Sequence, residues 1–383
     1  MTAGYNSDIK SQLAKCDEDW VHALSAFGKK KSPKDEIPSE DMYQMARSFI
    51  RSERVNIRKM WERFTTDREE LEDNTFSKIE RAYTYLTGFH LSNTARMLAL
   101  FERMEERSTR FSELTKGKHI HVFDIGCGTG ACSVAAAQVL SRNYTRSMSF
   151  YLTDASSHFL DMSRFFIERN TKAASIKSQK TTIEDAPSMR FTPQKGLNIY
   201  FFGYVLNELS SSPKAKRKIE TLLSEIASSS EPCLVVIAEP ANEAQARAAM
   251  KHRDEIAGGG FDVVYPCTHS QSCPMTEHEN GKNWCYSEFK IPKTRIQNKL
   301  DEEIEVKRTI LGASAYIFGN KTFGWTPESG KVVVGKPRLS FGEEATLKLL
   351  LCDKNRIHDS SAMKLEKAPL RGKIYFKGKQ HQS

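Results

Sequence analysis

The stretch His121–Gly130, which reads HVFDIGCGTG, constrains the fold of this chain more than any other feature. The residues His119–Phe123 are apolar and β-branched enough for a buried parallel strand, and Ala131–Leu140 is small, apolar and helix-forming. The three alternating glycines therefore lie on a turn from a strand to a helix. Glycine permits positive φ and a close approach to a ligand, while the next helix offers free N–H groups. The sequence predicts a nucleotide-binding loop.

The neighbours of this loop indicate which nucleotide it binds. Gly126, Gly128 and Ala131 also fit the relaxed dinucleotide fingerprint, a match that is weak by itself. Asp124 precedes the first glycine by two residues and Gly130 supplies a third, so the run Asp-x-Gly-x-Gly-x-Gly resembles motif I of the class I S-adenosylmethionine-dependent methyltransferases. A carboxylate suits a ligand with an ammonium and a sulfonium better than a pyrophosphate. We expect Asp124 and the three glycines to bind S-adenosylmethionine.

Strands and helices alternate from residue 119 onward, which predicts an α/β fold with a doubly wound, Rossmann-like parallel sheet. The strand Met148–Thr153 ends at Asp154, whose carboxylate is placed to accept the ribose hydroxyls of the cofactor. The segment Thr181–Asp185 has the pattern of a short strand, and Glu184 and Asp185 at its tip are expected near the adenine. The alternative is that both are loop acids without a role in binding.

The position that corresponds to motif IV of these methyltransferases follows the buried strand Leu197–Phe202. Ligands collect at the carboxyl ends of strands in open α/β sheets, so we expect Asn207 beside the cofactor. Glu208 is the nearest candidate for a catalytic base. The sequence contains no Asn-Pro-Pro-aromatic tetrad and no motif IV cysteine, and catalytic residues are therefore not assigned.

The charge of the chain points to an anionic partner. The net charge is +9 and the pI is near 9.0, which favours RNA over a membrane because no basic amphipathic membrane helix stands out. A modest positive surplus on an ordinary surface is the alternative. No apolar run of 18 residues occurs, and the acidic opening, Met1–Trp20, disfavours export and simple import. Five arginines form either a solvated helix face or a phosphate-binding one: Arg47, Arg51, Arg54, Arg58 and Arg63.

Four regions are predicted from the patterns along the chain. They are a helical N-terminal region, 1–116; a methyltransferase core, 117–260; a cysteine-rich segment, 261–302; and a β-rich basic C-terminal domain, 303–383. The helical region contains a helix that starts near Ser39, whose side chain can cap it. The expected strands of the last region include Ile304–Lys307, Ser314–Phe318 and Ala345–Leu351.

The cysteines of the third region suggest a metal site. Cys267, Cys273 and Cys285 fall within nineteen residues, and Cys352 follows a predicted strand further on. Four thiolates suit either a tetrahedral zinc ion or a [4Fe–4S] cluster, and the spacing leaves both open. A set of four thiols without any metal is the alternative. The other cysteines, Cys16, Cys127, Cys132 and Cys233, have the surroundings of small core residues, and nothing suggests disulfides.

Several motifs in one order resemble the methyltransferase-like proteins of small-ribosomal-subunit assembly, a family of bacteria and mitochondria. They are the glycine loop, Val205–Leu209, Glu239-Pro240, Arg253, the run Tyr265–Pro274, Trp284-Cys285 and the later Cys352. The resemblance covers roughly residues 75 to 360 and departs from the family pattern at Ala241, Thr268 and Tyr286.

This resemblance implies a [4Fe–4S] cluster held by Cys267, Cys273, Cys285 and Cys352, which would link the C-terminal domain to the core. It implies the small ribosomal subunit and its RNA as partners, and a location in a bacterial-type cytoplasm or, in a eukaryote, the mitochondrial matrix. A monomer is expected when the chain is free. The first hypothesis is an S-adenosylmethionine-binding iron–sulfur protein that acts on this subunit as an rRNA methyltransferase. Its rivals are a non-catalytic assembly factor and a zinc-containing small-molecule methyltransferase.

Overall fold

The computed structural model forms two compact units, each assembled from three separate chain segments. Unit 1 comprises Met1–Glu102, Thr115–Ala186 and Lys290–Leu311, and unit 2 comprises Arg103–Leu114, Pro187–Phe289 and Gly312–Ser383. The structure describes residues 3–25, 37–65, 76, 78–107, 109–142, 147–171, 174–185, 191–209, 212–276, 283–306, 308, 310–326, 330–335, 338–340, 346–354, 356–362 and 370–375. Among these residues, no helix combines the length and the apolar composition needed to cross a lipid bilayer.

The strands of unit 1 are parallel, as the βαβ pattern predicts. They are β1 (His119–Ile125), β2 (Ser147–Asp154) and β3 (Ala174–Lys180), in the order β3-β2-β1. Helices α6 (Ala131–Arg142) and α7 (Ser157–Asn170) make the crossovers and pack on each other. Six of the seven residues of β1 are buried, which explains its nearly continuous apolar sequence. β3 ends at Lys180, so the strand expected at Thr181–Asp185 is wrong.

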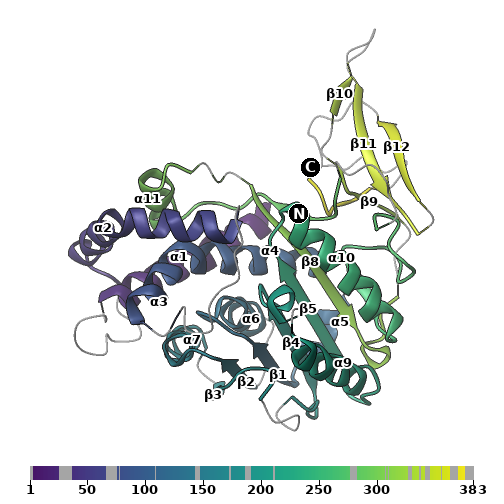
Figure 1. Cartoon of the computed structure of the whole chain (residues 1–383), viewed down its shortest axis with the longest axis horizontal. Helices are drawn as coiled ribbons and strands as arrows, with labels where there is room; N and C mark the ends of the chain where they lie inside the picture. Colours follow the sequence, from purple (N-terminus) through teal and green to yellow (C-terminus); the bar gives the residue numbers. More distant parts are fainter. Residues whose placement is uncertain are drawn as a thin grey trace. The chain divides into compact units, whose positions relative to one another are not determined.

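Helices make up the rest of unit 1. They are α1 (Ala3–Ser25), α2 (Glu40–Thr65), α3 (Ile79–Tyr85), the π-helical turn η1 (Leu86–His90), α4 (Leu91–Arg107), which runs on into unit 2, and α11 (Arg295–Glu303). Ser39 Oγ accepts the N–H of Met42 at 3.3 Å, which confirms the predicted cap. α11 lies against α1 and α2 (Figure 1). The strand expected from Ile304 is also wrong, because α11 is followed by a turn at that residue.

The strands that unit 2 contributes to the eight-stranded sheet form parallel and antiparallel pairs. β4 (Leu197–Gly203) and β5 (Cys233–Glu239) are parallel, whereas β8 (Leu311–Gly319) runs antiparallel to β5 and to β6 (Asp262–Tyr265), and β7 (Ser287–Phe289) also pairs with β8. The strand order β3-β2-β1-β4-β5-β8-β6 is that of a mostly parallel, doubly wound sheet, as predicted. The predicted strand Ser314–Phe318 therefore lies in β8 of this sheet and not in the C-terminal one.

The helices of unit 2 are α5 (Arg110–Thr115), α8 (Leu206–Leu209), α9 (Pro213–Ala227), α10 (Glu243–Gly258) and the short 3-10 turn η3 (Lys321–Phe323). A second, antiparallel sheet consists of β9 (Lys331–Val333), β10 (Arg338–Ser340), β11 (Thr346–Cys352), β12 (Ile357–Ala362) and β13 (Ile374–Tyr375). Cys352 is the last residue of β11 and pairs with Val332 on β9. This sheet therefore fixes the position of Cys352, which is the most distant in sequence of the four cysteines predicted to bind a metal.

Candidate functional site

The glycine loop of unit 1 has the positive φ values that its sequence predicts. Gly126, Gly128 and Gly130 have φ values of 68°, 51° and 80°. A Cβ on Gly130 would lie 2.9 Å from Cα and Cβ of Ser163 on α7, so this glycine is needed for packing. A Cβ on Gly128 would meet nothing nearer than the Tyr85 ring at 4.0 Å. The loop is thus fixed at Gly130 and keeps open space at Gly128.

Asp124, near the end of β1, points at the start of α6. Its Oδ2 accepts hydrogen bonds from Ser133, at 3.2 Å from the main-chain N and 2.6 Å from Oγ. Burial raises the pKa of Asp124 to about 7; the Ser133 hydrogen bonds oppose this rise and the nearby charge of Asp154 adds to it. A cation bound beside this carboxyl would favour its ionised form. The contact between Asp124 and Ser133 was not predicted from the sequence. A serine in the first turn of a helix that follows a glycine loop could have indicated a hydroxyl donor for a carboxylate beside that loop.

Asp154 is the side chain that the structure brings directly to the loop. Its Oδ2 accepts the N–H of Gly128 at 2.9 Å, and its Oδ1 accepts the N–H of Ser156 at 2.8 Å. The structure thus places Asp154 beside the glycine loop. Each carboxylate oxygen has a second lone pair, so these contacts leave room for hydroxyl donors. Binding of the ribose stays a prediction.

Asp185 is placed differently from its expectation. It is exposed in the turn after β3, where its Oδ2 accepts the Thr182 hydroxyl at 3.0 Å. β3 lies at the edge of the sheet and is largely polar, which weakens the sequence signal for its position. A role of Asp185 at the adenine stays a prediction without a strand to position it.

In unit 2, Asn207 forms hydrogen bonds with Glu239 and Gln245. Its main-chain N–H donates to Oε1 of Glu239 at 3.2 Å, and its amide Nδ2 donates to the main-chain oxygen of Gln245 at 3.4 Å and to the Gln245 side chain. Glu239 is completely buried at the end of β5, whereas Glu208, the candidate base, is exposed on α8. Asn207 therefore ties α8 to β5 and α10.

The four cysteines proposed as metal ligands all lie in unit 2 and are all buried: Cys267, Cys273, Cys285 and Cys352. Burial raises the pKa of the last three thiols, and the neighbouring cysteines raise it further, to about 12 for Cys285. Cys267 is among the neighbours that raise the pKa of each of these three thiols, so it lies near them. Within the described part of the chain, no group of three or more His, Cys, Asp or Glu side chains is arranged to hold a metal ion.

Arg253 on α10 holds the loop that carries two of these cysteines. Its buried guanidinium donates to the main-chain oxygens of His269, at 2.7 Å, and Gln271, and pairs with Asp254 at 2.6 Å. Asp254 accepts the N–H of Cys273 at 3.0 and 3.1 Å. Burial lowers the pKa of Arg253, but the thiols of Cys267 and Cys273 and the Asp254 carboxylate outweigh it and raise the pKa. A buried cation thus accompanies the thiols, and such a donor set fits an anionic thiolate centre.

The positions that depart from the family pattern have definite contacts in unit 2. Thr268 Oγ1 donates to the Gly330 oxygen at 3.2 Å, and the Arg371 guanidinium lies 4.0 Å over the Tyr286 ring. The Ala241 oxygen accepts the Trp284 Nε1–H at 2.7 Å. Arg107, which sequence reasoning missed, donates to the Cys267 oxygen at 2.9 Å. The cysteine loop is therefore held from several sides by side chains outside it.

The sheet order and the glycine loop define a Rossmann-like fold of the class I methyltransferase type. The family model for the Mitochondrial small ribosomal subunit Rsm22 matches residues 92–361, well over half of the chain. The chain belongs to that family. No curated protein is detectably similar to it in sequence.

Solved structures that resemble the chain are distant. A proposed RNA methyltransferase from Pyrococcus horikoshii is 13% identical, with 60% of this chain and 85% of that one covered and a TM-score of 0.31. A proposed class I S-adenosylmethionine-dependent methyltransferase from Listeria monocytogenes is 9% identical, with 85% and 91% covered and a TM-score of 0.37. These likenesses are too remote to bear on activity.

Proposed function

We propose that this chain is an S-adenosylmethionine-binding protein that acts on the small ribosomal subunit and its RNA in the mitochondrial matrix. The glycine loop carries the proposal, because it combines open space at Gly128 with the carboxylates of Asp124 and Asp154. These two acids suit the ammonium and ribose of the cofactor. The family supports the partner and the compartment, since it is named for the mitochondrial small ribosomal subunit.

We further propose that Cys267, Cys273, Cys285 and Cys352 hold a [4Fe–4S] cluster, with zinc as the alternative. The support is a set of four buried thiols that influence one another, beside the buried cation of Arg253. Thiolates ligate both metals, and a bound cluster supplies charge and a rigid cross-link. Because Cys352 ends β11 and Cys267 follows β6, the cluster would fasten the second sheet of unit 2 to the first.

Methyl transfer to rRNA is the activity that the fold suggests, and a non-catalytic assembly factor is the second candidate. The contacts of Asn207 favour the second candidate, because its amide donates to Gln245 within the protein. Purified protein incubated with radiolabelled S-adenosylmethionine and small-subunit precursors separates them. Label in RNA that depends on Asp124 supports the enzyme, and binding of precursors without label supports the factor.

Cofactor binding is tested by calorimetry with Asp124→Ala and Gly128→Arg. The first removes the carboxylate and the second fills the loop, so both should abolish binding, whereas Asp161→Ala on α7, outside the loop, should retain it. Unchanged affinity in both loop variants would overturn the assignment.

The cluster is tested by anaerobic purification and metal analysis. We expect a brown protein with about four irons per chain. Cys352→Ser should lose the iron, and Cys233→Ser, a buried core thiol on β5, should keep it. One zinc per chain without iron would contradict the iron–sulfur proposal, and full iron in Cys352→Ser would remove Cys352 from the ligand set.

A further inference from the structure

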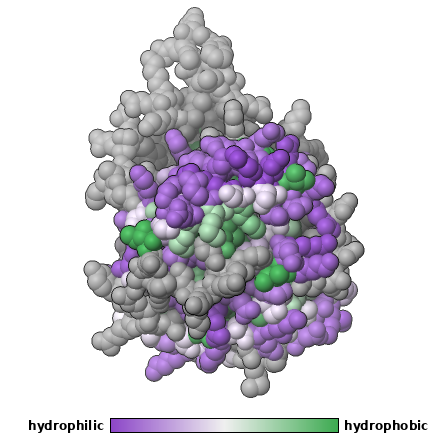
Figure 2. Space-filling view, turned by 90° about the vertical axis from the view of Figure 1, so that its left-hand side faces the viewer, coloured by the Kyte–Doolittle hydropathy of each residue, from purple (hydrophilic) through white to green (hydrophobic). Residues whose placement is uncertain are grey.

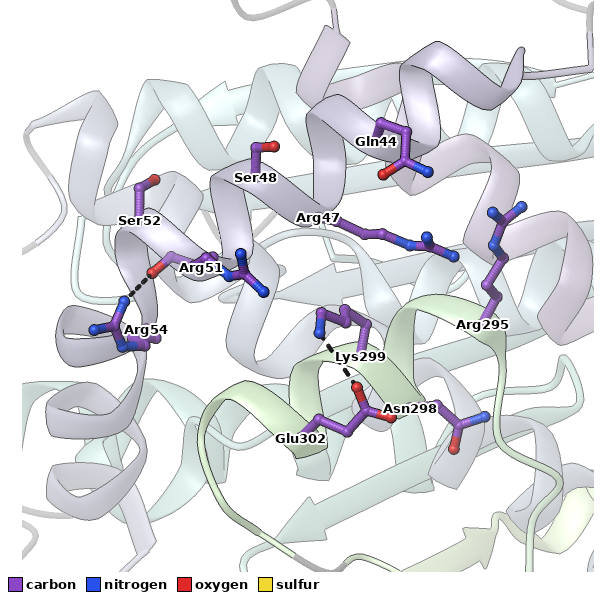
Figure 3. Close-up of a pocket in the computed structure, with 10 residues that line it drawn as sticks. All are labelled: Gln44, Arg47, Ser48, Arg51, Ser52, Arg54, Arg295, Asn298, Lys299 and Glu302. Atoms are coloured by element: carbon purple, nitrogen blue, oxygen red, sulfur yellow. Dashed lines mark hydrogen bonds and ion pairs between the residues drawn. The ribbon is translucent and has the colours of Figure 1, made fainter.

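A cationic groove lies in unit 1 between α2 and α11 (Figure 3). Its volume is about 730 Å³. Five basic side chains line it: Arg47, Arg51, Arg54, Arg295 and Lys299. Figure 2 shows that hydrophilic residues cover most of the described surface on the side of the molecule where α2 and α11 appear in Figure 1. All of the described lining residues are charged or polar, so the groove itself is a polar surface.

Ion pairs hold the two walls of the groove in place. Arg51 lies 3.4 Å from Glu303, and Arg295 lies 2.5 Å from Glu40 with its guanidinium 4.2 Å over the Tyr43 ring. These contacts join α2 to α11, which are about 250 residues apart in sequence. Arg51 and Arg295 are thus each paired with a carboxylate of the opposite wall, which lowers the entropic cost of placing these two side chains around an anion.

Positive charge exceeds negative charge in the groove. Glu302 is the one carboxylate among the described lining residues, and Glu40 and Glu303 at the margin pair with Arg295, Arg51 and Lys299. Arg54 donates to the main-chain oxygen of Arg51 at 2.9 Å and so adds charge without a carboxylate partner in that contact. The surplus matches a ligand that carries several negative charges.

The lining indicates which part of a nucleic acid would bind. The described lining has no aromatic ring on which a base could stack, and its remaining side chains, Gln44, Ser48, Ser52 and Asn298, offer hydrogen bonds to phosphate and sugar oxygens. Arg47 and Arg54 are seven residues apart on α2, or about 10 Å along the helix axis. That length spans several consecutive phosphates along one strand of a duplex.

We infer that this groove binds the phosphate backbone of structured RNA without reading its sequence. The inference deepens the proposed function, because it names the surface that would meet small-subunit RNA. α2 lies outside the part of the chain that the family model matches, whereas α11 lies inside it. The groove therefore combines one helix inside the matched range with one outside it.

The test measures binding of the full chain to a 20-base-pair RNA duplex of arbitrary sequence over a series of salt concentrations. Arg47→Gln/Arg54→Gln should weaken binding about tenfold at 0.1 M salt and lower the slope of log K against log salt by about two. The matched control, Arg58→Gln/Lys59→Gln, removes the same charge from α2 outside the groove and should retain the wild-type slope. Both variants should melt at the wild-type temperature.

Equal losses in both double variants, or a wild-type slope in Arg47→Gln/Arg54→Gln, would overturn the inference. A loss of binding to vesicles containing anionic lipid, with RNA binding unchanged, would also overturn it and assign the groove to membranes. The probe contains no ribosomal sequence and the assay contains no S-adenosylmethionine. Failure here is therefore distinguishable from failure of the proposed function, which the calorimetry and the small-subunit precursors test.

Discussion

Arg253 Nη2 lies 2.7 Å from the main-chain oxygen of His269, so a fully buried guanidinium on α10 fixes the loop between Cys267 and Cys273. An arginine enters a protein interior only when its charge is matched. Here Asp254 and two main-chain oxygens provide the match, and the same Asp254 binds the N–H of Cys273. Arg253 is therefore one of the side chains on which the loop geometry depends.

Arg253→Met should lower the free energy of unfolding by about 3 to 5 kcal/mol, because it leaves buried carbonyl groups without donors. Lys251→Met, on the exposed face of the same helix, should change it by less than about 0.5 kcal/mol. Urea unfolding measures both, and hydrogen exchange should show the Arg253 variant opening around Cys267 and Cys273. Equal stability of the two variants would contradict this role of Arg253.

Gly130→Ala should destabilise unit 1 more than Gly117→Ala. Both glycines have positive φ, 80° and 68°, which costs a residue with a Cβ about 1 to 2 kcal/mol. Only at Gly130 does the added Cβ also meet the backbone of Ser163, at 2.9 Å, and crowding of this kind adds about 1 to 3 kcal/mol. The difference in thermal unfolding between the two variants isolates the clash. No difference would mean that α7 moves away freely.

The affinity for S-adenosylmethionine should rise with pH through the titration of Asp124. Its pKa in the folded protein is about 7, and the cationic cofactor favours the ionised form. Between pH 5.5 and 7 we expect up to about tenfold tighter binding per pH unit, and a flat, weak profile for Asp124→Asn. Because this pKa lies above its unfolded value, the contribution of Asp124 to stability is full below about pH 4 and is lost as the pH rises through 7. A flat calorimetric profile for the wild type would contradict this link.

Thr294→Ala should destabilise unit 1 by about 1 to 3 kcal/mol, whereas Thr294→Ser should keep most of the stability. Thr294 Oγ1 accepts the N–H of Gln297 at 3.1 Å and donates to Asp17 on α1. Burial raises the pKa of Asp17 to about 6, so the stability that Asp17 provides is lost as the pH rises through that value. The Thr294 hydroxyl lowers this pKa, and the deficit of Thr294→Ala should be larger at pH 8 than at pH 5. Chemical unfolding at both pH values measures it.

The central elements could be predicted because their signals are local. The glycine loop, the strand before it and the helix after it each have a distinct composition. Asp154 is the last residue of the next strand, β2, whose apolar sequence is also a local signal. The cap at Ser39 was predicted for the same reason, since it depends on residues within one helical turn.

The rest depends on contacts between distant segments. Ile304 follows a helix rather than lying in a strand. That helix begins at the capping box of Thr294 and Gln297, and Asp17, from the other end of the chain, accepts the N–H of Ile296 in its first turn. The pairing of β8 with β5 is likewise invisible in the sequence of β8 itself. Arg107 could not be assigned to the cysteine loop because it belongs to a helix far ahead of it in sequence.

The position of α11 also determines when unit 1 can be completed during synthesis. α1 and α2 leave the ribosome early, but the helix that covers them is encoded after residue 290. At about 5 to 20 residues per second, these two helices wait on the order of ten seconds or more with part of their apolar surface uncovered. The nascent chain is therefore exposed to aggregation and to chaperones for most of its own translation, and a shortened chain that stops before Thr294 would never leave that state.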